Sequence, residues 1–439
     1  MSKSITVKTA FWLYNAGWNL AMPILRRNQR LAEGFEQRTL RENMPESADI
    51  WIQAASAGES YLAWLLIKNL KPDCPIKILL TSNTRQGMEI LARAIDDISP
   101  NDRGVSARAA YFPFDKPAIM EKAVRFVRPR IMVLLETELW PGLLSALKKY
   151  GSEILLINGR ISPGSLERYC LWPSFWHSLS PDKILAISEN DARRFGTLFG
   201  IKQPDVMQNM KFDRIDRADA CLKNPLEKIF PSDTPLLVLG STRQEEEPLI
   251  EKIILSIRRR HPDAVIGLFP RHMHRIEHWK AALDRMEIPW TLRSELTDKT
   301  QKSPFNGITI LWDMFGELSL AYELSKAAFV GGSLAPLGGQ NFLEALVCGV
   351  IPVIGPFWEN FAWVGHDISK QGLVHVAGDW KAAADMLTKN MESSPPHEAV
   401  REAALTYVKN RQGGTIQACN LILQCLSQSF FRKSSLPYL

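Results

Sequence analysis

A glycine-rich segment in the last third of the chain combines residue types that can bind a nucleotide. Its pattern predicts a strand over Ala327–Val330, a turn containing four glycines and Ser333, a helix over Asn341–Cys348 and a strand over Ile351–Ile354. Glycines let backbone N–H groups approach a ligand, and a helix N-terminus favours an anion. Glu344, within that helix, is placed to face ribose hydroxyls. A tight turn without a ligand is the alternative; Glu344 and the Gly-Pro after the second strand favour a nucleotide.

A carboxylate follows the first predicted strand. The apolar run Ile50–Ala55 predicts that strand, and the segment Ser-Ala-Gly-Glu-Ser follows it directly. Glu59 therefore lies at the carboxyl end of a parallel strand, where open α/β sheets bind ligands. From spacing alone, Glu59 is better explained as a first-turn helix residue that the helix dipole stabilises. A functional carboxylate is the alternative.

Two more carboxylates follow the strictly apolar strand Arg130–Leu135. Glu136 and Glu138 come directly after it, and Arg160 follows the next predicted strand. Because the carboxyl ends of parallel strands share one edge of a sheet, these side chains are expected beside Glu59. Surface ion pairs explain the same charges equally well.

Further charges follow two strands in the second half of the chain. The pair Arg271-His272 follows the strand Ala264–Phe269 and suits an anionic, phosphate-bearing ligand, although exposed loop charges are an alternative. Three glutamates, residues 245–247, open a helix after the strand Leu236–Leu239. They are interpreted as a solvated first turn that the helix dipole favours, without a chemical role.

Strands, polar turns and helices alternate through most of the chain. This alternation predicts two doubly wound parallel sheets of an α/β protein. The remaining predicted strands lie at 76–81, 109–112, 154–157, 184–187 and 308–311. Residues 396–427 are predicted to be helical, and residues 428–439 to be frayed.

The composition is that of a globular protein. The chain has 439 residues, of which 46% are apolar and 23% charged, and this length suffices for two to three domains. The net charge of +6 is too small to indicate nucleic acid, but it suits an anionic substrate or membrane surface. Six scattered cysteines without a CxxC pair indicate reduced thiols in a cytoplasmic protein. No set of converging ligands predicts a metal site.

The N-terminal region carries an uncharged stretch, Thr9–Leu25, followed by Arg26, Arg27 and Arg30. As a helix it would be about 26 Å long, slightly short of a hydrocarbon core. Its aromatic residues suit the headgroup zone. We therefore expect a short membrane anchor that spans the bilayer or lies in its interface, with a buried core helix as the alternative. The arginines after it predict that the main body is cytoplasmic.

Ordered blocks of sequence together resemble the Kdo (3-deoxy-D-manno-octulosonic acid) transferase family, which consists of two-domain glycosyltransferases of the GT-B type. Three positions depart from the family pattern: Gln53 and Gln340 replace His, and Gln208 replaces Gly. The blocks are S-x-G-E at 56–59, ETELWP at 136–141, N-x-R-x-S at 158–162, N-x-K-F-D at 209–213, PRH at 270–272, the loop before a GEL helix at 313–318, and FVGGSL, GG-x-N, LE and GP between 329 and 356.

The resemblance implies a GT-B fold, in which two Rossmann-like doubly wound parallel-sheet domains face a cleft. The implied segments are an N-terminal membrane anchor (1–27), an acceptor-binding domain (28–215), a linker (216–234), a nucleotide-sugar-binding domain (235–395), and C-terminal helices that pack back on the N-terminal domain (396–439).

The implied reaction is transfer of Kdo from CMP-β-Kdo to lipid IVA, the lipid A precursor of lipopolysaccharide biosynthesis, with inversion. Glu59 would be the catalytic base on the acceptor hydroxyl, with a pKa that burial raises toward neutrality. Ser333, the helix that starts near Gln340, and Arg271 would bind the CMP phosphate in place of a metal, and Glu344 would bind the ribose.

The implied site residues form two groups. The donor group comprises Ser241, Arg271, His272, Met314, Gly316, Glu317, Gly332, Ser333, Gln340, Asn341 and Glu344. The acceptor and sugar group comprises Ser56, Gly58, Glu136, Glu138, Arg160 and Lys211. Arg160, Lys211 and Arg271 are equal candidates for binding the carboxylate of the donor.

The implied partners are CMP-Kdo, lipid IVA and inner-membrane lipids, without nucleic acid, metal or other cofactor. The implied location is the cytoplasmic side of the inner membrane. Two alternatives stay open: another GT-B nucleotide-sugar enzyme, such as a UDP-sugar transferase or an epimerase, and a non-catalytic membrane scaffold.

Overall fold

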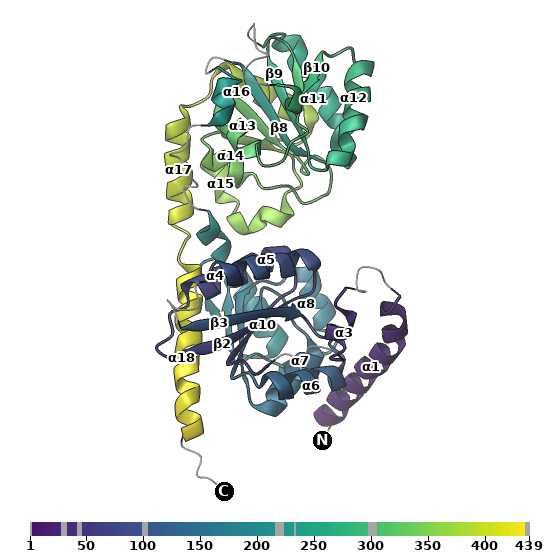
Figure 1. Ribbon diagram of the computed structural model, residues 1–439, viewed down its shortest axis with the longest axis vertical. Coiled ribbons are helices and arrows are strands. Elements are labelled where there is room, and N and C mark those ends of the chain that lie inside the picture. Colours follow the sequence, from purple (N-terminus) through teal and green to yellow (C-terminus); the bar gives the residue numbers. More distant parts are fainter. Residues whose placement is uncertain are drawn as a thin grey trace. The chain divides into compact units, whose positions relative to one another are not determined.

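The computed structural model describes residues 2–27, 33–41, 46–98, 104–215, 224–231, 234–296 and 305–434. Two compact units make up the chain (Figure 1). The first comprises Met1–Ile215 and Arg411–Leu439, and the second comprises Asp216–Asn410.

The first unit is built on a parallel sheet with the strand order β3-β2-β1-β4-β5-β6-β7. Its strands are β1 (Ile50–Ala54), β2 (Ile76–Ser82), β3 (Val105–Tyr111), β4 (Ile131–Leu135), β5 (Glu153–Gly159), β6 (Lys183–Ala186) and β7 (Asp205–Val206). Its helices include α1 (Ser2–Leu25), α3 (Phe35–Arg38), α4 (Ala57–Asn69), α5 (Arg85–Asp96), α6 (Pro117–Val127), α7 (Pro141–Tyr150), α8 (Pro163–Tyr169), α9 (Pro173–Ser178), α10 (Glu189–Phe199) and α18 (Gly414–Ser434).

Both faces of this sheet are covered, which explains why β4 is apolar at every position. Ile131, Val133 and Leu135 pack into one core with α4, α5 and α18, whereas Met132 and Leu134 pack into another with α6, α7, α9 and α10. In Figure 1, α4 and α5 lie on one side of the strands and α6 and α7 on the other. Successive side chains therefore serve opposite cores.

The second unit has a parallel sheet with the order β10-β11-β9-β8-β12-β13-β14. Its strands are β8 (Leu236–Thr242), β9 (Val265–Pro270), β10 (Trp290–Leu292), β11 (Thr309–Leu311), β12 (Ala327–Val330), β13 (Pro352–Ile354) and β14 (His375–Val376). Its helices include α11 (Glu247–Arg260), α12 (Ile276–Arg285), α13 (Leu318–Leu324), α14 (Leu343–Val347), α15 (Asp367–Lys370), α16 (Trp380–Glu392) and α17 (His397–Lys409).

The prediction of two doubly wound parallel sheets is confirmed. The short strands β7, β10 and β14, of two or three residues, carry too little pattern to be predicted. The helix predicted over Asn341–Cys348 is shorter, at Leu343–Val347. About half of the predicted linker 216–234 lies outside the described residues, which include 224–231 and 234 of it.

The two C-terminal helices belong to different units. This corrects the prediction that residues 396–439 all pack on the N-terminal domain. Helix α17 packs on α14 in the second unit, whereas α18 packs on α4 in the first. The start of α18 is fastened by Asp213, which accepts hydrogen bonds from the N–H groups of Gly413 (2.7 Å) and Thr415 (2.6 Å). Capping by Asp213 and the apolar face of α18 together place this helix on the first sheet.

Helix α1 packs on the first unit by one face. The Phe11 ring lies 4.9 Å from that of Phe175, and the Tyr14 hydroxyl donates a 2.6 Å hydrogen bond to Asp115. The opposite face exposes large apolar side chains, with Trp12 68% and Leu20 76% exposed. Within the described part of the chain, no helix is both long enough and apolar enough to cross a bilayer.

Candidate active site

The strand order of each unit creates one point where the winding direction reverses. In the first unit the chain winds from β1 toward β2 and β3, then returns to place β4 on the other side of β1. In the second unit β8 lies between β9 and β12 in the same way. Loops diverge at such reversal points, and open α/β sheets bind ligands there. Glu59, Glu136 and Glu138 follow β1 and β4 in the first unit, and Arg271 and Glu344 follow β9 and β12 in the second.

Glu59 lies in the first turn of α4, directly after β1. Its carboxylate accepts hydrogen bonds from the Ala55 N–H (2.7 Å) and the Ser56 hydroxyl (3.0 Å), while Ser56 caps the helix. The residue is only 9% exposed. Burial, with a further contribution from the carboxylate of Glu138, raises the pKa of Glu59 to about 7. The first-turn position expected from spacing is confirmed, and its environment also suits a general base at neutral pH.

Glu138 lies beside Glu59 and is held by neutral donors. Its carboxylate accepts hydrogen bonds from the Trp140 indole (2.6 Å) and the Gln53 amide (3.4 Å). Burial raises the pKa of Glu138. Gln53 is oriented because its oxygen accepts a 2.6 Å hydrogen bond from Thr81. A glutamine at position 53 therefore supplies a fixed N–H donor that does not ionise.

Glu136 is clamped by two cations. Arg160 contacts one carboxylate oxygen through Nε (2.8 Å) and Nη2 (2.7 Å), and Lys211 contacts the other through Nζ (2.5 Å). The Glu136 side chain is buried, and its φ of 56° lies in the left-handed region, which costs a non-glycine residue conformational energy. The predicted convergence of Glu136 and Arg160 is confirmed, and the pair is partly buried rather than a surface ion pair.

The second unit carries a carboxylate near the cation Arg271, which follows β9. Glu344 is partly buried in the first turn of α14, and its carboxylate accepts no hydrogen bond from any described residue. Burial raises the pKa of Glu344, and the cation Arg271 opposes this rise. His272 is exposed; slight desolvation, together with the charges of Arg243, His274 and Arg271, lowers its pKa. The carboxylate of Glu344 thus keeps its acceptor capacity for a ligand.

Comparisons with known proteins bear on the family of this chain. A family model described as 3-deoxy-D-manno-octulosonic acid transferase matches residues 26–214. A Kdo transferase of Haemophilus influenzae is 28% identical over 418 residues, 92% of this chain and 93% of that protein. A Kdo transferase of Rickettsia felis is 30% identical over 380 residues, 83% of this chain and 76% of that protein. The chain belongs to the Kdo transferase family.

A solved glycosyltransferase of Rickettsia africae resembles the chain with a TM-score of 0.55 at 12% identity, covering 88% of this chain and 99% of that one. At this identity the likeness concerns the fold alone. It agrees with the GT-B class expected for a Kdo transferase, with two parallel-sheet α/β domains in one chain.

In this Kdo transferase, the glycine turn does not present its N–H groups as predicted. The backbone N–H groups of Gly332 (2.6 Å), Ser333 (3.2 Å) and Leu334 (3.2 Å) all donate to the carboxylate of Glu246. The Ser333 hydroxyl is buried; it donates to the Val330 carbonyl (2.7 Å) and accepts from the Gly355 N–H (2.8 Å). The backbone donors that the prediction assigned to a phosphate are therefore engaged by an internal carboxylate in this structure.

Glu317 is also engaged within the protein. Its carboxylate contacts Arg293 (2.9 Å) and accepts a 2.8 Å hydrogen bond from the Trp312 indole. Met314 and Gly316 in the same loop are exposed, and a Cβ at Gly316 would meet open space. Met314 and the backbone of this loop are thus accessible to a ligand. Glu317 instead anchors the end of the loop through its contacts with Arg293 and Trp312.

The remaining predicted positions lie at or next to these strand ends: Ser241 within β8, Gly58 in the first turn of α4, and Gln340 and Asn341 in the loop before α14. Ser241 adopts a left-handed φ of 54° at the end of β8. The backbone N–H of Gln340 donates to Gly331 (3.1 Å), and Asn341 is exposed. A Cβ at Gly58 would touch only the Ser56 hydroxyl, at 3.8 Å, so packing does not explain this glycine.

Two residues of the second site were missed. Arg243 follows β8 next to Arg271, whose N–H donates to the Thr242 carbonyl (2.9 Å). Glu246 was interpreted with Glu245 and Glu247 as solvated, but Glu246 and Glu247 are buried. Glu247 pairs with Arg275 and with His278 (3.1 Å), which ties α11 to α12. The acidic run after a strand was visible in the sequence. The hydrogen-bond partners of Glu246 could not be predicted, because they depend on β8 and β12 being neighbours in the sheet.

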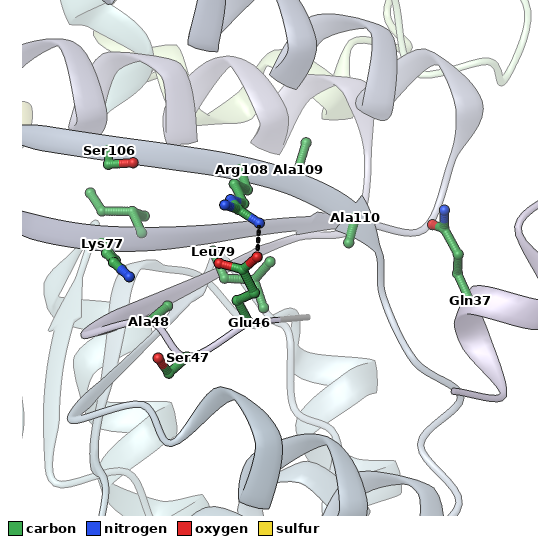
Figure 2. Close-up of a pocket in the computed structure, with 11 residues that line it drawn as sticks. Gln37, Glu46, Ser47, Ala48, Lys77, Leu79, Ser106, Arg108, Ala109 and Ala110 are labelled. Atoms are coloured by element: carbon green, nitrogen blue, oxygen red, sulfur yellow. Dashed lines mark ion pairs between the residues drawn. The ribbon is translucent and has the colours of Figure 1, made fainter. Parts of the chain in front are cut away.

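A separate pocket of about 430 Å³ lies on the first sheet, away from the strand ends (Figure 2). Arg108 of β3 and Glu46 form a 2.7 Å ion pair there, with Lys77 of β2 and Ser47 nearby. None of the predicted site residues lines this pocket. The pocket is lined by residues from the middle of β2 and β3, and its charges Arg108 and Glu46 pair with each other. We therefore treat it as distinct from the candidate active site.

Among the described residues, no group of three or more His, Cys, Asp or Glu side chains is arranged to hold a metal ion. The described residues place cations and carboxylates at both sites. At the second site they come from Arg243, Arg271 and Glu344.

Proposed function

We propose that this Kdo transferase moves Kdo from CMP-β-Kdo to lipid IVA, with Glu59 as the base. The observation that carries the proposal is the buried carboxylate of Glu59, whose pKa of about 7 lies at the working pH of a general base. Membership of the Kdo transferase family supports Kdo as the transferred sugar. The reversal point between β1 and β4, where α/β sheets bind ligands, supports the location of Glu59 in the active site.

The chemistry is a single inverting displacement. The acceptor hydroxyl oxygen forms a bond to the anomeric carbon of Kdo as the bond from that carbon to the phosphate oxygen breaks. The electron pair of the broken bond leaves with CMP, and the hydroxyl proton passes to Glu59. Ala55 and Ser56 orient the carboxylate through their hydrogen bonds.

The leaving CMP gains negative charge on its phosphate, and cations stabilise such charge without a metal. Arg243 and Arg271 supply these cations at the ends of β8 and β9. Glu344 has an acceptor-only carboxylate with no hydrogen-bond donor among the described residues, and ribose hydroxyls are suitable donors for it.

The direct test is mass spectrometry of lipid IVA after incubation with CMP-Kdo and the full-length protein. The expected product is lipid IVA carrying added Kdo, formed only with CMP-Kdo. A thermal shift with UDP rather than CMP, without this product, would instead support another GT-B nucleotide-sugar enzyme.

Glu344→Ala is expected to raise the KM for CMP-Kdo by about tenfold with a nearly unchanged kcat, because about 1.4 kcal/mol of ground-state hydrogen bonding is lost. Initial rates at varied CMP-Kdo concentration measure both constants. Glu359→Ala, at an exposed residue of the same unit, is the matched control. An unchanged KM in Glu344→Ala would reject the ribose role.

The exposed face of α1 is proposed to bind the inner-membrane surface from the cytoplasmic side. Its apolar residues Trp12, Leu20 and Ile24 are 68%, 76% and 71% exposed, and Arg26 and Arg27 follow them. Such a face suits burial at the headgroup boundary, with cations toward anionic lipid. This surface would bring the enzyme to its amphipathic acceptor.

The triple substitution of Trp12, Leu20 and Ile24 by Ser is expected to abolish most sedimentation with anionic vesicles. The inner face of α1, with Phe11 and Tyr14, stays intact, so the fold is preserved. Ile416→Ser, at an exposed position on α18, serves as the control. Undiminished sedimentation of the triple variant would place the attachment elsewhere.

A further inference from the structure

Glu246 is a fully buried carboxylate without a cation. Its Oε1 accepts from the N–H groups of Gly332 (2.6 Å) and Arg243 (3.0 Å), and its Oε2 accepts from Ser333 (3.2 Å) and Leu334 (3.2 Å). No described Lys, Arg or His forms an ion pair with it. Burial raises the pKa of Glu246, and these four hydrogen bonds oppose the rise. A buried charge is costly unless hydrogen bonds compensate it, and here backbone donors alone do so.

These contacts connect the two loops that flank the reversal point of the second sheet. Arg243 and Glu246 belong to the connection after β8, and the three consecutive N–H donors belong to the turn after β12. Consecutive N–H groups in a turn form a concavity that binds anions. The internal carboxylate fills this concavity, so these three N–H groups are not available to a phosphate.

The packing of the two loops shows how closely they are held. A Cβ at Gly331 would lie 2.5 Å from Glu246 Oε1 and 2.6 Å from the Ser241 carbonyl oxygen. Ser241 itself has a left-handed φ of 54°. The glycine is required for this approach, and the carboxylate bridges the loops at the same point.

We propose that Glu246 is a positioning residue for nucleotide binding: it locks the turn Gly331–Leu334 to the loop Ser241–Arg243, and thereby directs the donor phosphate to Arg243 and Arg271. This inference rests on the proposed use of a CMP-linked donor. Glu246 does not touch the nucleotide. It sets the backbone from which Ser241 and Arg243 reach the ligand, and it excludes phosphate from the glycine turn.

Isothermal titration of CMP into the full-length protein tests the role of Glu246. Glu246→Gln keeps the shape but places an NH₂ group against backbone donors, whereas Glu251→Gln removes a charge elsewhere on α11 and is the matched control. The expected result is a Kd for CMP raised about tenfold in Glu246→Gln, with unchanged stoichiometry and with a wild-type Kd in the control.

Titration separates positioning from folding because the stoichiometry reports the folded fraction and the Kd reports the site. A lowered stoichiometry with an unchanged Kd would show a merely structural role and overturn the inference. Unchanged or tighter CMP binding would also overturn it, since tighter binding would mean that the carboxylate competes with phosphate. If the wild-type protein itself does not bind CMP, the proposed function fails, and the inference fails with it.

Arg243→Gln provides a second measurement that does not disturb the buried carboxylate. Cytidine lacks the phosphate, so the ratio of the cytidine Kd to the CMP Kd isolates the phosphate contribution. This ratio is expected to fall about tenfold in Arg243→Gln. An unchanged ratio would show that the phosphate binds elsewhere and would overturn the assignment, even if Glu246→Gln failed to fold.

Discussion

Glu59→Gln is expected to slow Kdo transfer by about 10²–10⁴-fold, the usual contribution of a general base, while CMP binding stays near wild type. Glutamine is nearly isosteric and can still accept a hydrogen bond from the Ala55 N–H or from Ser56, but it cannot take the acceptor proton. Product formation measured by mass spectrometry and CMP affinity measured by titration separate the two effects.

Glu89→Gln is the control for this substitution. Glu89 lies on the exposed side of α5 and pairs with Arg85 (3.1 Å), away from the strand-end residues. Its transfer rate should equal that of the wild type. Full activity in Glu59→Gln would remove Glu59 from the mechanism, and equal loss of CMP binding would indicate a structural rather than a proton-transfer defect.

The transfer rate is also expected to depend steeply on pH. Glu59 acts only when ionised, and its pKa is raised to about 7, so kcat/KM should fall tenfold for each pH unit below that value. Between pH 7, where half of the Glu59 carboxyls are ionised, and pH 5 the loss is about fiftyfold. The measurement is the pH profile of kcat/KM. In Glu138→Gln the profile should move to lower pH, because a carboxylate that raises the pKa of Glu59 has been removed.

Unfolding does not explain such a loss of rate. Glu59 and Asp115 both have a pKa raised to about 7 by burial, so their protonated forms favour the folded state. Their contribution to stability is fully present below the unfolded pKa of about 4, and is lost as the pH rises through 7. Thermal unfolding at pH 5 and pH 7 checks this; a fall in melting temperature at pH 5 that parallels the rate would contradict the assignment.

Local sequence determined the main elements of both sheets, but not the short strands β7, β10 and β14. The five apolar residues of β4 and the Ser-capped start of α4 are readable because periodicity and capping depend on near neighbours in the chain. The position of Glu59 at a strand end followed from the same pattern. So did the expected convergence of Glu136 and Arg160, because carboxyl ends of parallel strands share one edge.

Other features depended on pairs of residues far apart in the sequence. The pKa of Glu59 depends on its burial and on Glu138, 79 positions later by their numbers. The glycine turn after β12 is filled by Glu246 from the loop after β8, because β8 and β12 are neighbours in the sheet. The division between α17 and α18 likewise depends on Asp213, which caps the second helix from two hundred residues away.

The sequence by itself determined the family, the two parallel sheets and the strand ends at which the charged residues lie. Only the tertiary structure decided which of these charges are engaged within the protein and which remain available to a ligand. The physical reason is that hydrogen-bond satisfaction and desolvation are set by neighbours in space: Ser333 and Glu317 have partners inside the fold, whereas the carboxylate of Glu344 has none among the described residues.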